Sequence, residues 1–176
     1  MTSMSELHII LGPMFSGKTT RLIKISEEYS NPLRINHALD TRYHDTDIVT
    51  HDGIHAPCIQ VFRLQDIDKQ VLSTADAIFI NEAQFFTDLL PVIKDWLATY
   101  RKPIYVCGLD GDFRQQPFGD LLNIIPLCDT VEKLRAECLC GNPAIFTYRL
   151  SADQEQTLIG TDEYETYCRA CFLRLD

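Results

Sequence analysis

The fold of this chain is decided by one stretch, Gly12-Pro13-Met14-Phe15-Ser16-Gly17-Lys18-Thr19, which matches the pattern G-x-x-x-x-G-K-S/T without a gap. A short apolar run, Leu7 to Leu11, precedes it, and apolar residues at helical spacing follow from Lys18 to about Tyr29. Between a strand and a helix, such glycines let backbone N–H groups converge on phosphate oxygens. The stretch predicts a phosphate-binding loop; the alternative is a glycine-containing turn with a solvated lysine.

Two side chains at the end of this loop are candidates for separate roles. Lys18 is expected to neutralise the β- and γ-phosphates of ATP, and the Thr19 hydroxyl is expected to ligate Mg²⁺. Such a site also needs an acidic group at the end of a neighbouring strand. Asn81 and Glu82 follow the buried-strand type of run Ala77 to Ile80, so they are the candidates for that position.

These two candidates differ in what they can do. Asn81 stands where P-loop enzymes usually carry an Asp, so it can meet Mg²⁺ through its amide oxygen or through a water but brings no charge. Glu82 is the carboxylate of this strand end, and we expect it to accept the proton of an attacking hydroxyl. The alternative is a carboxylate at a helix start with no chemical role.

The remaining apolar runs alternate in the manner of an α/β protein. Strands are predicted over Cys58 to Leu64 and Ile104 to Cys107, and Leu89 to Leu97 has the spacing of a helix packed on a sheet. This order predicts a parallel sheet covered by helices. The polar segment Asp40 to Ala56 is expected to be a mobile surface loop, and the regular patterns fade from Ala136 onward.

Cysteine spacing indicates a metal site near the C-terminus. The pairs Cys138-Leu139-Cys140 and Cys168-Arg169-Ala170-Cys171 supply four thiols, and four thiolates form a closed structural Zn²⁺ site. The first pair is C-x-C where C-x-x-C is the commoner half-site. The alternative is a set of reduced core cysteines, for which three others are better candidates because apolar residues surround them: Cys58, Cys107 and Cys128.

Composition narrows the function classes. The 176 residues suit one ordinary domain with a small appendage, and the formal net charge of −9 argues against nonspecific binding of nucleic acid. No apolar run approaches the roughly 20 residues that span a membrane, so no membrane association is expected. Seven cysteines without a secretory leader favour a reducing cytoplasm.

Several motifs together resemble the thymidine kinases of the cytosolic, zinc-containing type. The resemblance covers nearly the whole chain and rests on the phosphate loop with four further stretches: Asp40-Thr41-Arg42-Tyr43, Glu82-Ala83-Gln84-Phe85-Phe86, Gly108-Leu109-Asp110-Gly111-Asp112-Phe113 and Pro117-Phe118-Gly119. The segment Tyr164 to Cys171 extends it to the C-terminus. The resemblance implies transfer of the γ-phosphate of ATP to the 5′-hydroxyl of thymidine, giving dTMP in nucleotide salvage for DNA synthesis.

The resemblance also implies roles for particular residues. Glu82 becomes the general base and Arg42 a cation on the phosphate side, with Lys18 as the third catalytic residue. Asp40, Thr41, Asn81 and Gln84 join the phosphate loop in the ATP site. The residues implied for the nucleoside pocket and for the lasso-like loop that covers it are Met14, Phe85, Phe113, Phe118, Gln156, Thr157, Leu158, Ile159, Gly160 and Tyr164.

The expected architecture is an α/β P-loop domain over residues 1–135 and a zinc-binding lobe with the nucleoside-covering loop over 136–176. The resemblance further implies a homotetramer and feedback inhibition by dTTP. Two departures stand out: Asn81 in place of an acid, and a short, polar segment Leu33 to Leu39 where the family has a stronger apolar strand. The alternative functions are a degenerate kinase homologue that binds nucleotide and nucleoside, and a P-loop ATPase with a zinc ribbon.

Overall fold

The computed structural model describes residues 5–39, 47–50, 53–158, 160 and 162–175. Its centre is a six-stranded sheet in the order β5-β2-β6-β7-β1-β8, and every neighbouring pair in it is parallel. The strands are β1 (Glu6–Leu11), β2 (Pro32–His37), β5 (Ile59–Val61), β6 (Ala77–Ile80), β7 (Pro103–Gly108) and β8 (Thr130–Lys133). The predicted α/β fold with a parallel sheet is confirmed.

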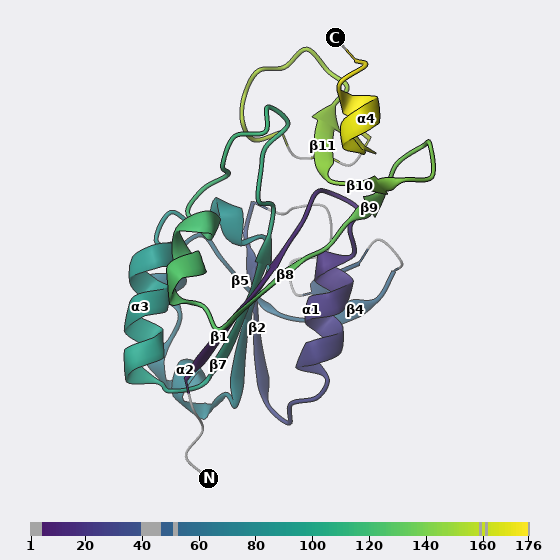
Figure 1. Cartoon of the computed structure of the whole chain (residues 1–176). Coiled ribbons are helices and arrows are strands. Elements are labelled where there is room, and N and C mark those ends of the chain that lie inside the picture. The colour runs from purple at the N-terminus through teal and green to yellow at the C-terminus, as the bar shows by residue number, and fades with distance from the viewer. Residues whose placement is uncertain (1–4, 40–46, 51–52, 159, 161, 176) are drawn as a thin grey trace.

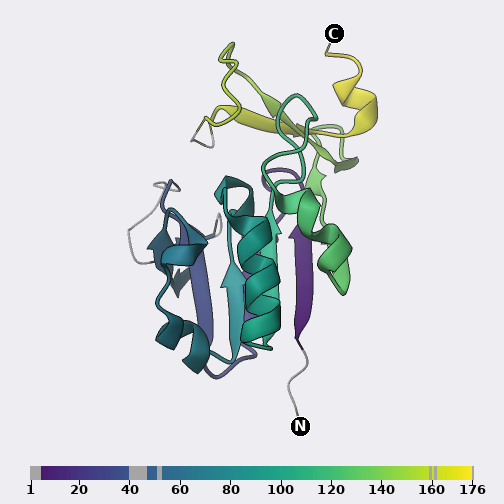
Figure 2. The same ribbon diagram turned by 90° about the vertical axis from the view of Figure 1, so that its left-hand side faces the viewer.

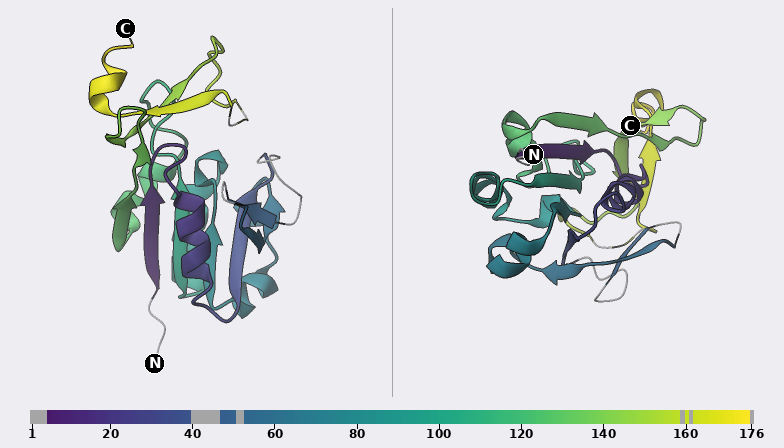
Figure 3. Two further views of the ribbon diagram at one scale, coloured as in Figure 1. Left: turned by 90° about the vertical axis from the view of Figure 1, so that its right-hand side faces the viewer. Right: turned by 90° about the horizontal axis from the view of Figure 1, so that it is seen from below.

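Helices cover both faces of the sheet (Figure 1). Helix α1 (Lys18–Ser26) lies on one face, which Figure 3 presents to the viewer. The other face, presented in Figure 2, carries α2 (Lys69–Thr74) and α3 (Leu89–Thr99). The short 3-10 helices are η1 (Leu64–Asp66), η2 (Ala83–Phe85) and η3 (Leu121–Leu127). Among the described helices, none combines the length and the apolar character that crossing a membrane requires.

Burial explains why the strands read as apolar runs. All four residues of β6 are buried, because a central parallel strand is covered by helices on both faces. The larger core cluster joins the sheet to α3 through residues such as Ile78 and Ile93. A smaller cluster joins the sheet to α1 through Leu22 and Phe79. The sheet therefore has a packed apolar core on each of its two faces, and the candidate site residues follow the ends of its strands.

Parallel strands bring the predicted motifs to one edge of the sheet. In the register, Leu11 of β1 is level with Gly108 of β7, and Ile80 of β6 is level with Val106 of β7. The phosphate loop, the residues after β6 and those after β7 all follow carboxyl strand ends. This is the edge at which open α/β sheets bind ligands.

Short elements follow the sheet near the C-terminus, where the sequence patterns fade. The strands are β9 (Ala136–Glu137), β10 (Pro143–Ala144), β11 (Phe146–Arg149) and β12 (Tyr164–Tyr167), followed by helix α4 (Arg169–Phe172). They pair as two antiparallel hairpins, β9 with β10 and β11 with β12. Figures 1 and 2 show this part of the chain beyond the carboxyl ends of the sheet. Its small core consists of Ala136, Cys138, Ala144 and Cys168.

Three expectations about the sheet region need correction. The segment expected to be a loop, Asp40 to Ala56, contains a hairpin of β3 (Asp47–Val49) and β4 (His55–Pro57) in its described part. The polar segment Leu33 to Leu39 is not a weak strand, because β2 lies inside the sheet between β5 and β6. Helix α1 ends at Ser26, three residues before Tyr29.

Candidate functional site

A pocket lies where the phosphate loop faces the C-terminal hairpins. Most of the predicted site residues line it together: Met14, Phe15, Ser16, Gly17, Lys18, Thr19, Asn81, Glu82, Gln84, Phe85, Phe113, Phe118, Gln156, Thr157, Leu158, Gly160 and Tyr164. Gly12 and Pro13 belong to the loop but are not among the lining residues. Asp40, Thr41, Arg42 and Ile159 lie outside the described residues.

The phosphate loop needs its glycines for space and for backbone conformation. A Cβ on Gly12 would lie 2.7 Å from Ser16 Oγ and 2.8 Å from the Leu134 carbonyl oxygen, both closer than packed atoms allow. Gly17 has a φ of 80°, in the left-handed region, and directly precedes α1. Lys18 is buried, and its Nζ donates a hydrogen bond of 2.7 Å to the Pro13 carbonyl. The ammonium group is therefore held across the loop that would receive the phosphates.

A buried polar chain connects Thr19 to the neighbouring strands. The Thr19 hydroxyl donates to Asn81 Oδ1 over 3.2 Å, so that a lone pair of the hydroxyl oxygen stays available to a cation. Asn81 Nδ2 in turn donates to Asn36 Oδ1 over 3.0 Å. Both asparagines are 2% exposed. Asn36 fixes which way the Asn81 amide faces, and sequence reasoning missed it because it belongs to no motif.

Cys107 completes this chain from β7. Its thiol donates to Asn81 Oδ1 over 3.0 Å, and the residue is 1% exposed. Burial raises the pKa of Cys107 to about 12, and the nearby Glu82 charge adds to the rise. The thiol therefore stays protonated at neutral pH and acts as a donor. This agrees with the expectation that Cys107 is a core cysteine; Cys58 and Cys128 are only half-buried.

Glu82 is held in an uncommon backbone conformation. Its φ of 52° lies in the left-handed region, which costs a residue other than glycine about 1–2 kcal/mol. Gln84 orients its carboxylate, because Gln84 Nε2 donates to Glu82 Oε2 over 2.6 Å. The Gln84 Oε1 accepts from the Leu109 backbone N–H over 3.0 Å. Gly108 allows this arrangement, since a Cβ there would collide with the Gln84 side chain.

Aromatic side chains form the other half of the pocket. Phe85 and Phe118 meet edge to face, with ring centroids 5.6 Å apart. The Arg149 guanidinium lies over the Phe113 ring, 4.0 Å from its centroid, and 5.2 Å from the centroid of Tyr164. Flat apolar surfaces of this kind suit a planar base. Arg149 is a site residue that the sequence did not reveal, because nothing in its local pattern marks it.

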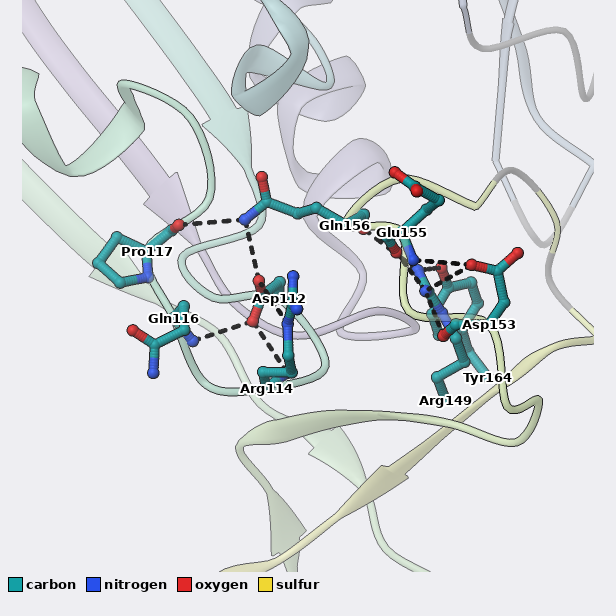
Figure 4. A network of polar contacts seen from close by, with 9 residues as sticks. All are labelled: Asp112, Arg114, Gln116, Pro117, Arg149, Asp153, Glu155, Gln156 and Tyr164. Atoms are coloured by element: carbon teal, nitrogen blue, oxygen red, sulfur yellow. Dashed lines mark hydrogen bonds and ion pairs between the residues drawn. The ribbon is translucent and has the colours of Figure 1, made fainter.

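Arg149 also shapes the loop that follows β11. Its guanidinium donates to the carbonyl oxygens of Asp153, Glu155 and Gln156 and to the Tyr164 hydroxyl (Figure 4). The side chain is 1% exposed, so this charge is taken out of water and matched by fixed dipoles and by the Asp153 carboxylate, whose Oδ1 lies 4.0 Å from Nη1. Its Nε atom is buried without a hydrogen-bond partner. One arginine therefore supports the loop on one side and the aromatic pocket on the other.

A contact across the pocket ties the phosphate loop to the C-terminal hairpin. The Met14 backbone N–H donates to Thr147 Oγ1 over 3.0 Å, and the two residues are 133 positions apart in sequence. Both line the same pocket. The position of β11 is thus coupled to that of the phosphate loop, and Thr147 is a third residue that sequence reasoning missed.

The four predicted zinc ligands come together. The sulfur atoms of Cys138, Cys140, Cys168 and Cys171 all lie within 4.8 Å of one another, and those of Cys140 and Cys168 are 3.6 Å apart. A tetrahedral site with Zn–S bonds of about 2.3 Å needs sulfurs about 3.8 Å apart, so the cluster fits zinc. A hydrogen bond from the Asn142 backbone, with bonds from the neighbouring thiols, lowers the pKa of Cys140 to about 6. The C-x-C spacing thus places the Cys138 and Cys140 sulfurs close to those of Cys168 and Cys171, as a four-thiolate site requires.

This geometry fits one class of chemistry. A cradle for phosphates, an oriented carboxylate and a pocket for a flat base open into one space. A hydroxyl on a molecule in the aromatic half could be deprotonated by Glu82 while it faces a phosphate held by the loop.

Comparison with known proteins agrees with a site for phosphoryl transfer and identifies the family. A family model described as thymidine kinase matches residues 5–172 of the chain. The thymidine kinase of Yaba monkey tumor virus is 42% identical over 176 residues, which cover 97% of this chain and 96% of the viral protein. The cytosolic thymidine kinases of Gallus gallus and Homo sapiens are each 37% identical over 175 residues, which cover 96% of this chain and 77% and 74% of theirs. A match of this length and identity settles the family, and the chain belongs to the thymidine kinases.

Proposed function

We propose that this chain transfers the γ-phosphoryl group of ATP to the 5′-hydroxyl of thymidine, giving dTMP and ADP through the residues of the pocket described above. Family membership makes the chain a kinase of nucleotide salvage that phosphorylates thymidine. The observation that carries the residue assignment is the convergence of Lys18, Glu82 and Phe113 on one pocket. Nothing in the fold or in the comparisons favours a degenerate homologue or an ATPase.

Each residue has a distinct part in the transfer. The phosphate loop binds the triphosphate, and Lys18 neutralises charge on the β- and γ-phosphates as it develops. The rings of Phe113 and Tyr164 bound the base, with Met14, Phe85 and Phe118 closing the apolar side. Glu82 then takes the proton of the 5′-hydroxyl as its oxygen attacks the γ-phosphorus. The Gln84 hydrogen bond fixes the orientation of the Glu82 carboxylate for this role.

Magnesium belongs beside Thr19. The Thr19 hydroxyl would hold a Mg²⁺ ion there, and the ion would supply positive charge that offsets the charge of the phosphates. The Thr19 hydroxyl fits this role because it donates its proton to Asn81 and leaves an oxygen lone pair for the ion. Asn81 acts indirectly, by holding that hydroxyl. Asp40, Thr41 and Arg42 are proposed to complete the phosphate site by resemblance to the family.

Zinc has a structural role in this proposal. The four thiolates would bind it in a closed set, with no open position for catalysis. It would join β9, β10 and α4 into one unit with a core of only four buried residues. We propose the division into residues 1–135 and 136–176 on this basis, with the loop after β11 covering the nucleoside.

Four further proposals concern feedback inhibition, assembly, nucleic-acid binding and cellular location. By resemblance, dTTP inhibits by placing its base in the nucleoside pocket and its phosphates toward the phosphate loop, and the chain assembles as a homotetramer. The net charge of −9 disfavours nucleic acid as a partner. Relatives named as cytosolic favour a cytoplasmic location. Light scattering of the purified protein tests the tetramer, and inhibition kinetics test dTTP.

The substrate assignment is tested by measuring ADP release from Mg·ATP with different acceptors. The assay compares thymidine, deoxyuridine, deoxycytidine, duplex DNA and no addition. Rapid release with thymidine, accompanied by dTMP, is the expected result. Release that is independent of nucleoside, or that needs DNA, would instead indicate an ATPase.

A further inference from the structure

The turn that carries Phe113 is organised by one buried carboxylate. Asp112 is 4% exposed, and its Oδ1 accepts hydrogen bonds of 2.9 Å from the backbone N–H groups of Arg114 and Gln116. The Asp112 backbone N–H closes the same turn on the Gln116 carbonyl over 2.9 Å. One oxygen of the carboxylate is thus used within the turn. The conformation that presents Phe113 to the pocket depends on it.

The second carboxylate oxygen reaches a different part of the chain. Gln156, from the loop after β11, donates from Nε2 to Asp112 Oδ2 over 2.9 Å (Figure 4). The same Nε2 lies 3.5 Å from the Pro117 carbonyl oxygen, at the other end of the turn. Gln156 and Asp112 are 44 residues apart in sequence. This contact therefore joins the nucleoside-covering loop to the α/β part of the chain.

In the described part of the loop, the Gln156 side chain carries hydrogen bonds that reach the α/β part of the chain. Residues Ala152 to Glu155 are exposed, and Gln156 itself is half-buried. Arg149 holds the carbonyls of Asp153, Glu155 and Gln156, which fixes the shape of the loop on its own hairpin. These hydrogen bonds stay within the hairpin and its loop, and the Arg149 guanidinium meets the Phe113 turn through the ring face, 4.0 Å from the Phe113 centroid. The Gln156 side chain points to that turn, and its acceptor is a charged group, which makes the bond stronger than one between neutral partners.

We propose that Asp112 and Gln156 form a latch that holds the nucleoside-covering loop against the Phe113 turn and thereby sets the affinity for the nucleoside. The two are positioning residues: their polar atoms bind each other, while Phe113, Leu158 and Tyr164 provide the surface that meets the base. This inference rests on the proposed function and assigns the pair a role in its nucleoside step. Sequence reasoning placed Gln156 among the substrate-binding residues; it lines the pocket, and its side chain also donates to Asp112.

The latch can be broken and rebuilt by exchanging acid and amide. Gln156→Glu places two carboxylates in contact and should raise KM for thymidine about tenfold or more, because a charged bond is lost and like charges meet. Arg114 Nε, 3.9 Å from Asp112 Oδ2, offsets part of this repulsion. Asp112→Asn should change KM by less than about threefold, because the Gln156 amide can rotate to accept from the new amide.

The double variant Asp112→Asn with Gln156→Glu is the decisive member of the set. The introduced amide keeps an oxygen for the two backbone N–H groups and donates to the introduced carboxylate, so the latch reforms with its polarity reversed. We expect its KM for thymidine to return to within about threefold of wild type. The KM for ATP and the melting temperature should stay near wild type throughout, which a general structural defect would not allow.

The outcomes separate the latch from the proposed function. Thymidine-dependent turnover by the wild type tests the function, and the ratios among the four proteins test the latch. Calorimetric binding of thymidine gives the same ratios as a direct Kd. The latch is overturned if Gln156→Glu leaves KM and Kd within twofold of wild type. It is also overturned if the double variant is no better than Gln156→Glu alone.

Discussion

Replacing Asn81 by aspartate should strengthen Mg²⁺ binding and weaken the folded state in the absence of the ion. The Thr19 hydroxyl oxygen lies 3.2 Å from Asn81 Oδ1. A carboxylate in place of the Asn81 amide would therefore be separated from the proposed ion by the Thr19 hydroxyl. A unit charge about 5 Å from a divalent ion is worth roughly 7 kcal/mol at an effective dielectric of 20. Desolvation of a group only 2% exposed offsets much of this attraction.

The net gain expected for Asn81→Asp is about 1.4 kcal/mol, which corresponds to a tenfold lower concentration of Mg²⁺ at half-maximal rate. Without Mg²⁺ the same charge is buried, and the Nδ2 donor to Asn36 is lost. The free energy of unfolding should therefore fall by about 1–3 kcal/mol. Denaturant unfolding of wild type and Asn81→Asp, with and without Mg²⁺, measures this change in the free energy of unfolding.

The assay is the initial rate of ADP release against free Mg²⁺ at saturating ATP and thymidine. Asn36→Asp is the matched control, because it adds the same charge on β2 at a residue bonded to Asn81 rather than to Thr19. The Mg²⁺ requirement of the control should change less than that of Asn81→Asp. An unchanged Mg²⁺ requirement in Asn81→Asp, with the protein folded, would refute the placement of the ion beside Thr19.

Three other perturbations give further predictions. Removing zinc with a chelator should raise KM for thymidine before KM for ATP, since Cys168 directly follows β12, whose hairpin with β11 flanks the covering loop; equal rises in both constants would contradict this. Lys18→Met should lower kcat about 100- to 1,000-fold with the fold intact by circular dichroism, and a loss under tenfold would remove Lys18 from the catalytic residues. Because burial raises the pKa of Cys107 from 9.0 to about 12, the folded chain keeps a proton that the unfolded chain releases near pH 9. The free energy of unfolding should therefore fall as pH rises above about 9, and Cys107→Ala should flatten that slope in urea titrations between about pH 8 and 10.5. Equal slopes in the two proteins would show that the Cys107 pKa is not raised.

Sequence reasoning found the sheet and the edge that carries the candidate site, because both depend on local patterns. Leu7 to Leu11 and Ala77 to Ile80 are apolar runs that a covered parallel sheet requires, and they became β1 and β6. Residues directly after such strands, Glu82 among them, were brought to one edge by the parallel topology. The cysteine pairs were recognisable for a similar reason, because ligand spacing is a short-range property.

The rest depends on contacts between distant segments. Asn36 orients Asn81 across 45 positions, and Asp112 meets Gln156 across 44, so no local pattern contains either pair. Arg149 lies in a four-residue strand whose character comes from pairing with β12. Strands of two to four residues near the C-terminus are too short for alternation to be read from the sequence.

The most direct test of the central claim is thymidine-dependent ADP release by Glu82→Gln under saturating Mg·ATP and thymidine. Glu27→Gln, at an exposed position at the end of α1, is the matched control for loss of one carboxylate. If Glu82 is the base, kcat falls about 100- to 10,000-fold in Glu82→Gln and stays near wild type in Glu27→Gln. A Glu82→Gln protein that keeps more than about a tenth of the wild-type kcat would contradict the account.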